Sequence, residues 1–280
     1  MAEIINGKKI AQRVLAGLKK QTIRLKKNQK PSLAVILIGH DPASRLYVSL
    51  KEKRAKEVGI AFKKFFLPAT ASQAVIIKLI KKLNANPEIT AILVQLPLPG
   101  RQNVEKIISA ISPAKDADGI HPNNLKILKA HAQPPILPAT TGAVIAILTA
   151  LKIKPHDKSV AIIGKSKIAG LPTYYYLKNK CRAISIYDRS TKNLAGKTKK
   201  ADLVIVAIGQ PKFVTAKYLK PGAVVIDIGI SKVKKKTVGD VDFDQAKNIC
   251  SAITPVPGGV GPVTVAILLQ NTLKLYRDQL

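Results

Sequence analysis

Residues 160–170 of the chain form the stretch Val160-Ala161-Ile162-Ile163-Gly164-Lys165-Ser166-Lys167-Ile168-Ala169-Gly170. Its apolar start is typical of a buried strand. The glycine-bounded turn that follows opens a helix, so backbone amides and the helix dipole can approach a pyrophosphate. The G-x-G-x-x-G spacing of the standard dinucleotide fingerprint is absent, as is the upstream glycine of a nucleoside-triphosphate loop. The turn favours a dinucleotide site and disfavours a nucleoside triphosphatase; an ordinary strand-to-helix turn is the alternative.

Three further apolar runs follow this turn, at Ala183–Tyr187, Leu203–Ile208 and Val224–Ile228. The last two end at Gly209 and Gly229. Parallel strands that are buried on both faces have such continuous apolar runs, and their ligands bind over the carboxyl ends. Together with the strand before the turn, these runs predict a dinucleotide-binding α/β sheet.

Asp188 and Arg189 directly follow the strand 183–187, at the position where an adenosine ribose is read. The Asp188 carboxylate would bond a free ribose hydroxyl and repel a 2′-phosphate. Arg189, helped by Lys165, would instead pair with that phosphate. The residues alone leave the choice between NADP and NAD open.

The first half of the chain alternates helical and strand-like segments in the same βα manner. Asp41 and Pro42 form a good helix start, since Asp caps free backbone amides and Pro suits the first turn, and Gly59 is a natural stop. This half is therefore a second α/β unit. We expect helices at 8–27, 42–58 and 73–83 and strands at 33–38, 62–67 and 89–96.

The segment Pro113–Pro138 is rich in Pro, Asn and His and has no clear period, which predicts a functional loop before a domain boundary. A connecting helix is expected at Ala143–Leu151. The last predicted helix, Pro262–Arg277, has no strand after it, and we expect it to pack back across the boundary between the domains.

The formal charge of +31 comes from 47 Lys plus Arg against 16 Asp plus Glu. Because the lysines are spread over nearly every segment, with no Trp and little Phe, a solvated surface is favoured over a nucleic-acid-reading patch. The longest apolar stretches, Leu33–Gly39 and Ala143–Leu151, are far shorter than the ~20 residues that cross a bilayer. The N-terminus also lacks the apolar core of a secretory signal. We expect a protein of the cytoplasm, without a membrane or nucleic-acid partner, and its scattered Cys and His residues suggest no disulfide framework and no metal site.

Four polar residues of the first half are candidates for chemistry. Tyr47 and Lys51 lie on one face of a predicted helix, where burial would lower the pKa of the lysine toward neutrality. Gln95 ends a buried strand and needs a hydrogen-bonding partner, for which a ligand is a candidate. The alternatives are ordinary helix packing for the Tyr–Lys pair and a turn-forming role for Asp118.

Long motifs connect these segments in a fixed order. They are Gly39-His40-Asp41-Pro42-Ala43-Ser44, Leu93-Val94-Gln95-Leu96-Pro97-Leu98-Pro99, Lys115-Asp116-Ala117-Asp118-Gly119-Ile120-His121-Pro122, Asp227-Ile228-Gly229-Ile230 and Thr254-Pro255-Val256-Pro257-Gly258-Gly259-Val260-Gly261-Pro262-Val263-Thr264. With Tyr47, Lys51 and the 164–170 turn, they closely resemble the bifunctional methylenetetrahydrofolate dehydrogenase/methenyltetrahydrofolate cyclohydrolase family. The resemblance covers nearly the whole chain, and the last motif is highly specific.

The resemblance implies two α/β domains with a cleft between them. One is a folate-binding catalytic domain at 1–138, completed by the C-terminal helix 262–280, and the other is a Rossmann-like dinucleotide-binding domain at 139–261. The implied enzyme belongs to one-carbon metabolism and purine biosynthesis. It oxidises 5,10-methylenetetrahydrofolate to the methenyl form with NADP, which we favour, or with NAD, and it hydrolyses the product to 10-formyltetrahydrofolate. A homodimer is expected.

By the same resemblance, Lys51 is the essential acid/base group, Gln95 supports it, Tyr47 stacks on the folate and Asp118 holds the pterin ring. No metal is implied. Further residues are implied for the folate (Ser44, Pro257, Gly258, Gly259 and Pro262) and for the dinucleotide (Gly164, Lys165, Ser166, Arg189, Gly209 and Ile230).

The chain departs from the family pattern at three places. Pro138-Ala139-Thr140-Thr141-Gly142 lacks the family's cysteine and is one residue short, Asp188 stands where most relatives have His, and Lys165 replaces the arginine of the glycine turn. These changes bear on loop geometry and on the choice of dinucleotide. The alternatives are a dehydrogenase that has lost cyclohydrolase activity, against which the retained catalytic residues argue, and a basic nucleic-acid-binding protein.

Overall fold

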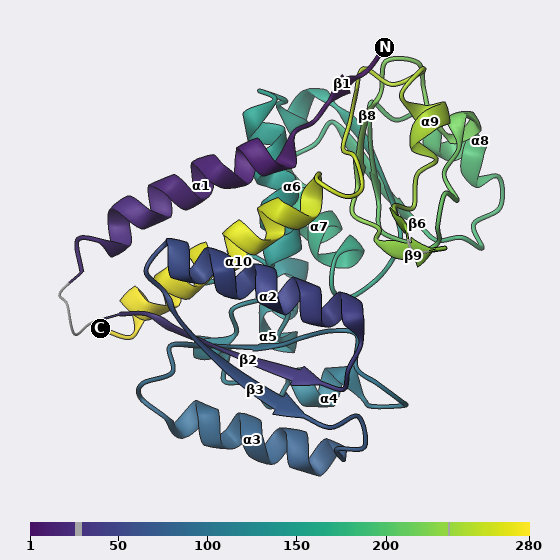
Figure 1. The fold of residues 1–280 in the computed structure, drawn as a ribbon. Helices are drawn as coiled ribbons and strands as arrows, with labels where there is room; N and C mark the ends of the chain where they lie inside the picture. The colour runs from purple at the N-terminus through teal and green to yellow at the C-terminus, as the bar shows by residue number, and fades with distance from the viewer. Residues whose placement is uncertain (26–29, 235) are drawn as a thin grey trace. The chain divides into compact units, whose positions relative to one another are not determined.

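The computed structural model describes residues 1–25, 30–234 and 236–280, and the chain divides into two compact units (Figure 1). Unit 1 comprises Met1–Gln12, Ile127–Gln133 and Thr140–Thr264, and unit 2 comprises Arg13–Lys126, Pro134–Ala139 and Val265–Leu280. Each unit is therefore built from segments that are distant in sequence. None of the described helices is long and apolar enough to cross a membrane.

Unit 2 is built on a three-stranded parallel sheet in the order β3-β2-β4. Its strands are β2 (Ser32–Ile38), β3 (Ala61–Leu67) and β4 (Ala91–Val94). Helix α2 (Pro42–Glu57) lies on one face of the sheet and α3 (Gln73–Ala85) on the other (Figure 1). Because both faces are covered, the central strand β2 is continuously apolar rather than alternating. The three strands predicted in this half are confirmed, although β4 is shorter than expected.

Local chemistry sets the limits of α2. The Asp41 side chain accepts a hydrogen bond from the Ser44 backbone N–H at 2.7 Å and caps the helix, and Pro42 occupies the first turn. The helix ends just before Val58, and Gly59 takes a positive φ of +76°. The predicted start and stop signals are therefore confirmed.

Helix α3 closes the core of unit 2 on its second face. Ile76 and Ile80, one turn apart, are fully buried and pack with Ile36 of β2. Ile107 of the short helix α4 (Val104–Ile108) joins the same cluster. The helix predicted at 73–83 is confirmed.

Unit 1 contains a six-stranded parallel sheet in the order β1-β11-β8-β7-β5-β6. The four predicted strands are present as β5 (Ser159–Ile163), β6 (Ala183–Tyr187), β7 (Leu203–Val206) and β8 (Val224–Asp227). Two further strands, β11 (Ala252–Ile253) and β1 (Glu3–Ile4), extend one edge. They are too short to show a sequence period, so they were not expected. Through β1, the start of the chain belongs to unit 1 instead of the domain that its chain order suggests.

Helices and short elements complete the chain. Helices α8 and α9 cover one face of the unit 1 sheet, where Leu194 and Ala246 pack with Val204 (Figure 1). On α6 and α7, the hydroxyls of Thr141 and Thr173 share a buried hydrogen bond of 3.0 Å. The bounds of the helices and of the antiparallel β9–β10 pair are α1 (Gly7–Thr22), α5 (Pro122–Lys129), α6 (Ala139–Ala150), α7 (Gly170–Leu177), α8 (Leu194–Thr198), α9 (Phe243–Ala246), α10 (Val260–Asp278), η1 (Pro113–Lys115), η2 (Pro155–Asp157), η3 (Ala216–Tyr218), β9 (Ser231–Val233) and β10 (Lys236–Val238).

The segment Pro113–Pro138 is not the loop that its composition predicts, because it contains η1 and α5. Leu128 of α5 is buried, but a helix of about two turns is too short for its apolar period to stand out among Pro and Asn residues. Helix α6 begins earlier than the predicted Ala143, and α10 confirms the last predicted helix. The first predicted helix is present as α1, but it ends at Thr22, earlier than expected; the expected end at Lys27 lies outside the described residues.

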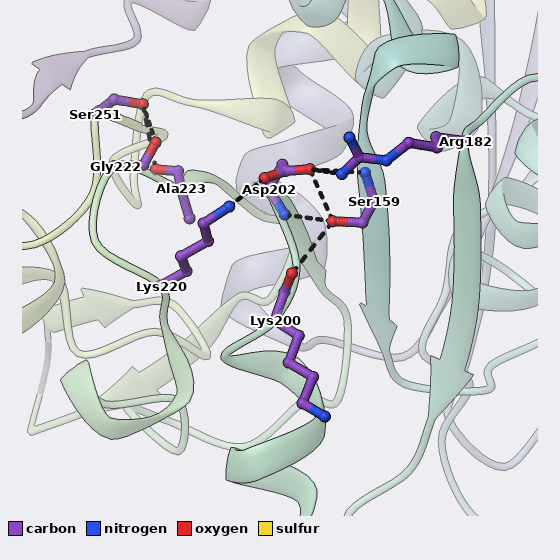
Figure 2. A network of polar contacts seen from close by, with 8 residues as sticks. All are labelled: Ser159, Arg182, Lys200, Asp202, Lys220, Gly222, Ala223 and Ser251. Atoms are coloured by element: carbon purple, nitrogen blue, oxygen red, sulfur yellow. Dashed lines mark hydrogen bonds and ion pairs between the residues drawn. The ribbon is translucent and has the colours of Figure 1, made fainter.

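A network of hydrogen bonds and ion pairs stabilises the amino-terminal edge of the unit 1 sheet (Figure 2). The Asp202 carboxylate accepts hydrogen bonds from the backbone N–H of Ser159 at 2.9 Å, from Arg182 at 2.8 Å and from Lys220 at 2.6 Å. The bonds from Lys220 and Ser159 hold the pKa of this carboxyl below its usual range. Asp202 therefore ties the start of β5 to the chain that enters β7, at the edge opposite to the ligand-binding ends of the strands.

We expect Asp202→Ala to lower the free energy of unfolding by about 1–3 kcal/mol, because it leaves the Ser159 N–H and two cations without their acceptor. Thermal unfolding followed by circular dichroism measures the change. Asp244→Ala is the matched control, since Asp244 is exposed and pairs with Lys247 three residues away. Equal melting temperatures for the two variants would contradict the role of Asp202.

Candidate active site

Lys51 and Gln95 form the centre of a polar site in unit 2. The Lys51 ammonium donates a hydrogen bond to Gln95 Oε1 at 2.8 Å. Gln95 directly follows β4, and its Nε2 donates to the Leu96 carbonyl at 2.5 Å. Because the amide nitrogen is held in this way, the amide oxygen faces the lysine. The polar residue at the end of the buried strand thus has a protein partner on each side of its amide.

The electrostatics of Lys51 suit proton transfer. Burial lowers the pKa of Lys51 to about 8, and the carboxylate of Asp118 opposes this shift by favouring the ammonium form. Burial also raises the pKa of Tyr47, which precedes Lys51 by one helical turn on α2. A lysine with this pKa holds a sizeable neutral fraction near neutral pH and can both accept and donate a proton.

Asp118 lies in the loop after η1, and its neighbours hold that loop against β4. The buried carboxylate of Asp116 accepts hydrogen bonds from the backbone N–H groups of Gly119 at 3.1 Å and His121 at 2.7 Å. Burial raises the pKa of Asp116 to about 7. Burial also raises the pKa of Asp118, and the nearby charge of Lys51 opposes that shift. The turn that carries Asp118 is therefore stiff, and its carboxyl stands in the electrostatic range of the lysine.

Two supporting residues escaped the sequence analysis. Asp116 lies inside the motif that holds Asp118. A second aspartate close to a glycine was the feature of the sequence that could have identified it, because such aspartates accept hydrogen bonds from turn N–H groups. The side chain of Asn271 on α10 donates to the carbonyls of Ala117 and Leu137, both at 3.0 Å. No signal in the sequence separates Asn271 from the other polar residues of α10, such as its neighbours Gln270 and Thr272.

Ser44 is buried near the start of α2. Its hydroxyl donates to the Asp41 carboxylate at 2.8 Å, so the side chain takes part in the helix cap. Pro257, Gly258 and Gly259 lie elsewhere, in the loop of unit 1 between β11 and α10. The structure thus brings together the candidates on α2, after β4 and after η1, whereas the glycine-rich loop belongs to the other unit.

The glycine turn of unit 1, residues 164–170, has no room for a side chain at either end. Gly164 has a φ of +122°, and a Cβ there would stand 2.1 Å from the Ala207 carbonyl oxygen. A Cβ on Gly170 would stand 1.8 Å from the Gly164 oxygen. Both ends of the turn are buried, whereas residues 165–168 are exposed, so the backbone of the turn is accessible just before α7. This arrangement fits the pyrophosphate of a dinucleotide.

Two further candidates for the dinucleotide stand at the carboxyl ends of neighbouring strands. Gly209 follows β7 with a φ of +72°, and no atom lies within 4 Å of a Cβ built there. Ile230 follows β8, and its side chain is 46% exposed although it is large and apolar. Gly209 leaves open space and Ile230 presents an apolar surface, two features that a planar ring requires.

An ion pair that was not predicted from the sequence joins the glycine turn to the turn after β6, which was predicted to read the ribose. Lys165 Nζ donates to Asp188 Oδ2 at 2.6 Å. The other carboxylate oxygen accepts from the hydroxyls of Ser190 at 2.6 Å and Thr191 at 3.2 Å, and these bonds together hold the pKa of Asp188 well below its usual range. Asp188 therefore neutralises Lys165, while Arg189 is exposed and has no carboxylate partner within the described part of the chain.

These features define an α/β enzyme with a dinucleotide-binding unit and a lysine-centred site. Family models match both halves: Tetrahydrofolate dehydrogenase/cyclohydrolase, catalytic domain, at residues 5–118, and the NAD(P)-binding domain of the same name at residues 138–280. The chain belongs to this tetrahydrofolate dehydrogenase/cyclohydrolase family, and the resemblance inferred from its motifs is confirmed.

Individual relatives agree over the full length. Bifunctional protein FolD from Geotalea uraniireducens is 45% identical over 276 residues, which are 98% of each chain. The crystal structure of the bifunctional enzyme FolD from Campylobacter jejuni is 38% identical, with a TM-score of 0.95 and 100% of both chains covered. The Trypanosoma brucei enzyme, solved with NADP cofactor and an inhibitor, is 36% identical, with a TM-score of 0.93 over 99% of this chain and 98% of that one.

We expect Asp118→Asn to lower the pKa of Lys51 below about 8, because the substitution removes the negative charge that favours the ammonium form. Titration of the lysine side chain by NMR measures the shift. Glu52→Gln is the matched control, since Glu52 pairs with Lys56 and Lys64 on the surface. An unchanged or raised pKa in Asp118→Asn would show that the two groups do not interact.

Proposed function

We propose that Lys51, positioned by Gln95, is the acid/base residue of an enzyme with two successive activities. The enzyme oxidises 5,10-methylenetetrahydrofolate to the methenyl form with NADP and hydrolyses that product to 10-formyltetrahydrofolate. The observation that carries the assignment is the 2.8 Å hydrogen bond from a lysine of lowered pKa to a fixed glutamine. A dehydrogenase without cyclohydrolase activity and a nucleic-acid-binding protein are not favoured, since full-length relatives are bifunctional FolD proteins.

The two units have different binding roles. We assign folate binding to unit 2, where Tyr47 stacks on the folate and Asp118 holds the pterin ring by a charge-assisted hydrogen bond. Ser44 contributes by fixing the start of α2. The family resemblance also assigns folate binding to Pro257, Gly258 and Gly259, in the loop before α10, and to Pro262, in the first turn of that helix; their small or rigid side chains permit close approach. The domain limits proposed from the sequence are 1–138 with 262–280, and 139–261.

The dinucleotide, when bound, accepts a hydride from the methylene carbon of the folate. The turn residues Gly164, Lys165 and Ser166 bind its phosphates, and Gly209 and Ile230 line the space for its nicotinamide half. These residues orient the ring and exclude water, which is the main contribution a protein makes to hydride transfer.

The proton transfers of hydrolysis use Lys51 and Gln95 of unit 2. Water adds to the methenyl carbon, and neutral Lys51 accepts the proton that the water loses. The resulting ammonium returns a proton to the ring nitrogen as the bond between that nitrogen and the same carbon breaks. The hydroxyl of the adduct releases its proton to solvent and becomes the carbonyl of the formyl group, which stays on the other nitrogen. Gln95 holds the lysine in place through both transfers, and the pKa of about 8 supplies both protonation states near neutral pH.

NADP is the dinucleotide of this chain, and Arg189 supplies the cation for its 2′-phosphate. Lys165 is the second cation of that surface, although Asp188 neutralises it in this structure. Use of NAD remains compatible with the Asp188 carboxylate, which bonds ribose hydroxyls.

The setting of the enzyme follows from its family. We propose a homodimer in the cytoplasm, with a place in one-carbon metabolism and in the supply of formyl groups for purine biosynthesis. The excess of lysine over acidic residues favours folates with acidic glutamate tails.

We expect Lys51→Met to abolish methenyltetrahydrofolate hydrolysis while the fold and NADP binding remain, because Met fills similar space without an exchangeable proton. The loss of methenyl absorbance in a spectroscopic assay measures hydrolysis. Lys53→Met is the matched control, since Lys53 is an exposed lysine on the same helix. Hydrolysis at the wild-type rate in Lys51→Met would contradict the assignment of Lys51 as the acid/base residue.

We expect Arg189→Ala to reduce catalytic efficiency with NADP about tenfold more than with NAD, because the 2′-phosphate loses a charge-assisted hydrogen bond. Asp188→Ala should improve the use of NADP, since it frees Lys165. Both changes are measured as ratios of kcat/KM, with the exposed Lys192→Ala as control. If Arg189→Ala leaves the NADP-to-NAD ratio unchanged, the ribose-reading turn is wrongly assigned.

A further inference from the structure

Two buried carboxyl groups stand at the carboxyl edge of the unit 1 sheet, outside the residues assigned above. Asp227 is the last residue of β8, and Asp240 follows the β9–β10 pair. Their exposed fractions are 3% and 0%. Neither forms an ion pair with Lys or Arg within the described part of the chain, so backbone N–H groups are their partners.

Asp240 binds the backbone at the end of β7. Its Oδ2 accepts hydrogen bonds from the N–H groups of Ile208 at 2.7 Å and Gly209 at 2.8 Å. Its carboxyl also packs against Gly229, where a Cβ would stand 2.0 Å from the Asp240 Cγ atom. The same carboxyl group therefore fixes the chain after β7 and the residue that precedes Ile230 after β8.

Asp227 in turn holds Asp240. Its Oδ1 accepts from the N–H groups of Gly229 at 3.0 Å and Asp240 at 3.1 Å, and its Oδ2 accepts from Val241 at 2.9 Å. The Asp227 N–H donates to the hydroxyl of Thr254 at 2.7 Å. The two carboxyl groups thus connect three chain segments at one edge of the sheet.

The burial of these two carboxyl groups lowers the stability of the fold. Burial raises the pKa of both groups, that of Asp227 to about 7, and the Asp240 charge adds to the shift at Asp227. The Asp240 Oδ1 atom is buried and has no hydrogen-bond partner in the structure. Buried carboxyl groups without cations destabilise a fold relative to apolar side chains of similar volume. Asp202, at the opposite edge of the same sheet, is by contrast paired with Arg182 and Lys220.

We propose that Asp240, held by Asp227, is a positioning residue for the dinucleotide, because it sets the backbone of the two segments that carry Gly209 and Ile230. This inference rests on the proposed function, in which those two residues line the space for the nicotinamide half. Asp240 touches neither the cofactor nor the folate. It acts through the N–H groups that it binds, so its loss loosens the cofactor site and leaves the lysine-centred chemistry of unit 2 in place.

The test compares Asp240→Ala with Asp240→Asn and with Asp202→Ala. NADPH binding is titrated by the fluorescence of the reduced nicotinamide, and hydrolysis of methenyltetrahydrofolate is followed in the same preparations. We expect Asp240→Ala to raise the Kd for NADPH and the KM for NADP about tenfold, with hydrolysis within about twofold of wild type. Asp240→Asn keeps an oxygen that accepts both N–H groups and should retain a Kd within about threefold. Asp202→Ala should lower the melting temperature without changing the Kd.

Two outcomes overturn the inference. A wild-type Kd in folded Asp240→Ala would show that Asp240 does not position the cofactor. An equal rise of Kd in Asp202→Ala would show that loss of stability alone weakens binding. If Asp240→Ala does not fold, Asp240→Ser, whose shorter side chain does not extend to the two N–H groups, must show the same rise in Kd. A wild-type protein that lacks NADP-dependent oxidation would refute the proposed function instead, because that result does not depend on Asp240.

Discussion

A chain that leaves the carboxyl end of a buried parallel strand carries backbone N–H groups that no neighbouring strand can satisfy. Unit 1 meets that constraint with a side-chain oxygen, and unit 2 satisfies the N–H groups of the turn after η1 in the same way. Asp116 accepts the N–H groups of the turn that carries Asp118, and Asp240 accepts those that follow β7. The carboxyl groups that accept these hydrogen bonds therefore also fix the loops that carry the candidate functional residues.

Burial has opposite effects on the acids and on the base of the site, and the chemistry uses that difference. Desolvation lowers the pKa of Lys51 and raises that of Asp118, while each of the two groups limits the shift of the other. Gln95 adds a neutral acceptor, so it fixes the lysine without adding charge. The result is a lysine that changes protonation state near neutral pH within a fixed geometry.

Much of the fold was predictable from the sequence. The four apolar runs of unit 1, the helix between Asp41 and Gly59 and the last helix are present because their signals are local: continuous burial, caps and period. The elements that escaped prediction are short. Strands β1 and β11 exist only because they pair with each other and with β8, and α5 carries too few apolar residues to show a period.

The sequence by itself determined the shared face of Tyr47 and Lys51, the glycine turn and the family, since residue order and spacing carry that information. The family resemblance implied that Gln95 supports Lys51, and the tertiary structure shows their contact across 44 positions of chain. Only the tertiary structure decided that Asp188 neutralises Lys165 across 23 positions and that Asp240 binds Gly209 across 31. The physical reason is that hydrogen bonds and ion pairs act over a few ångströms in space, and the fold alone brings such distant positions that close.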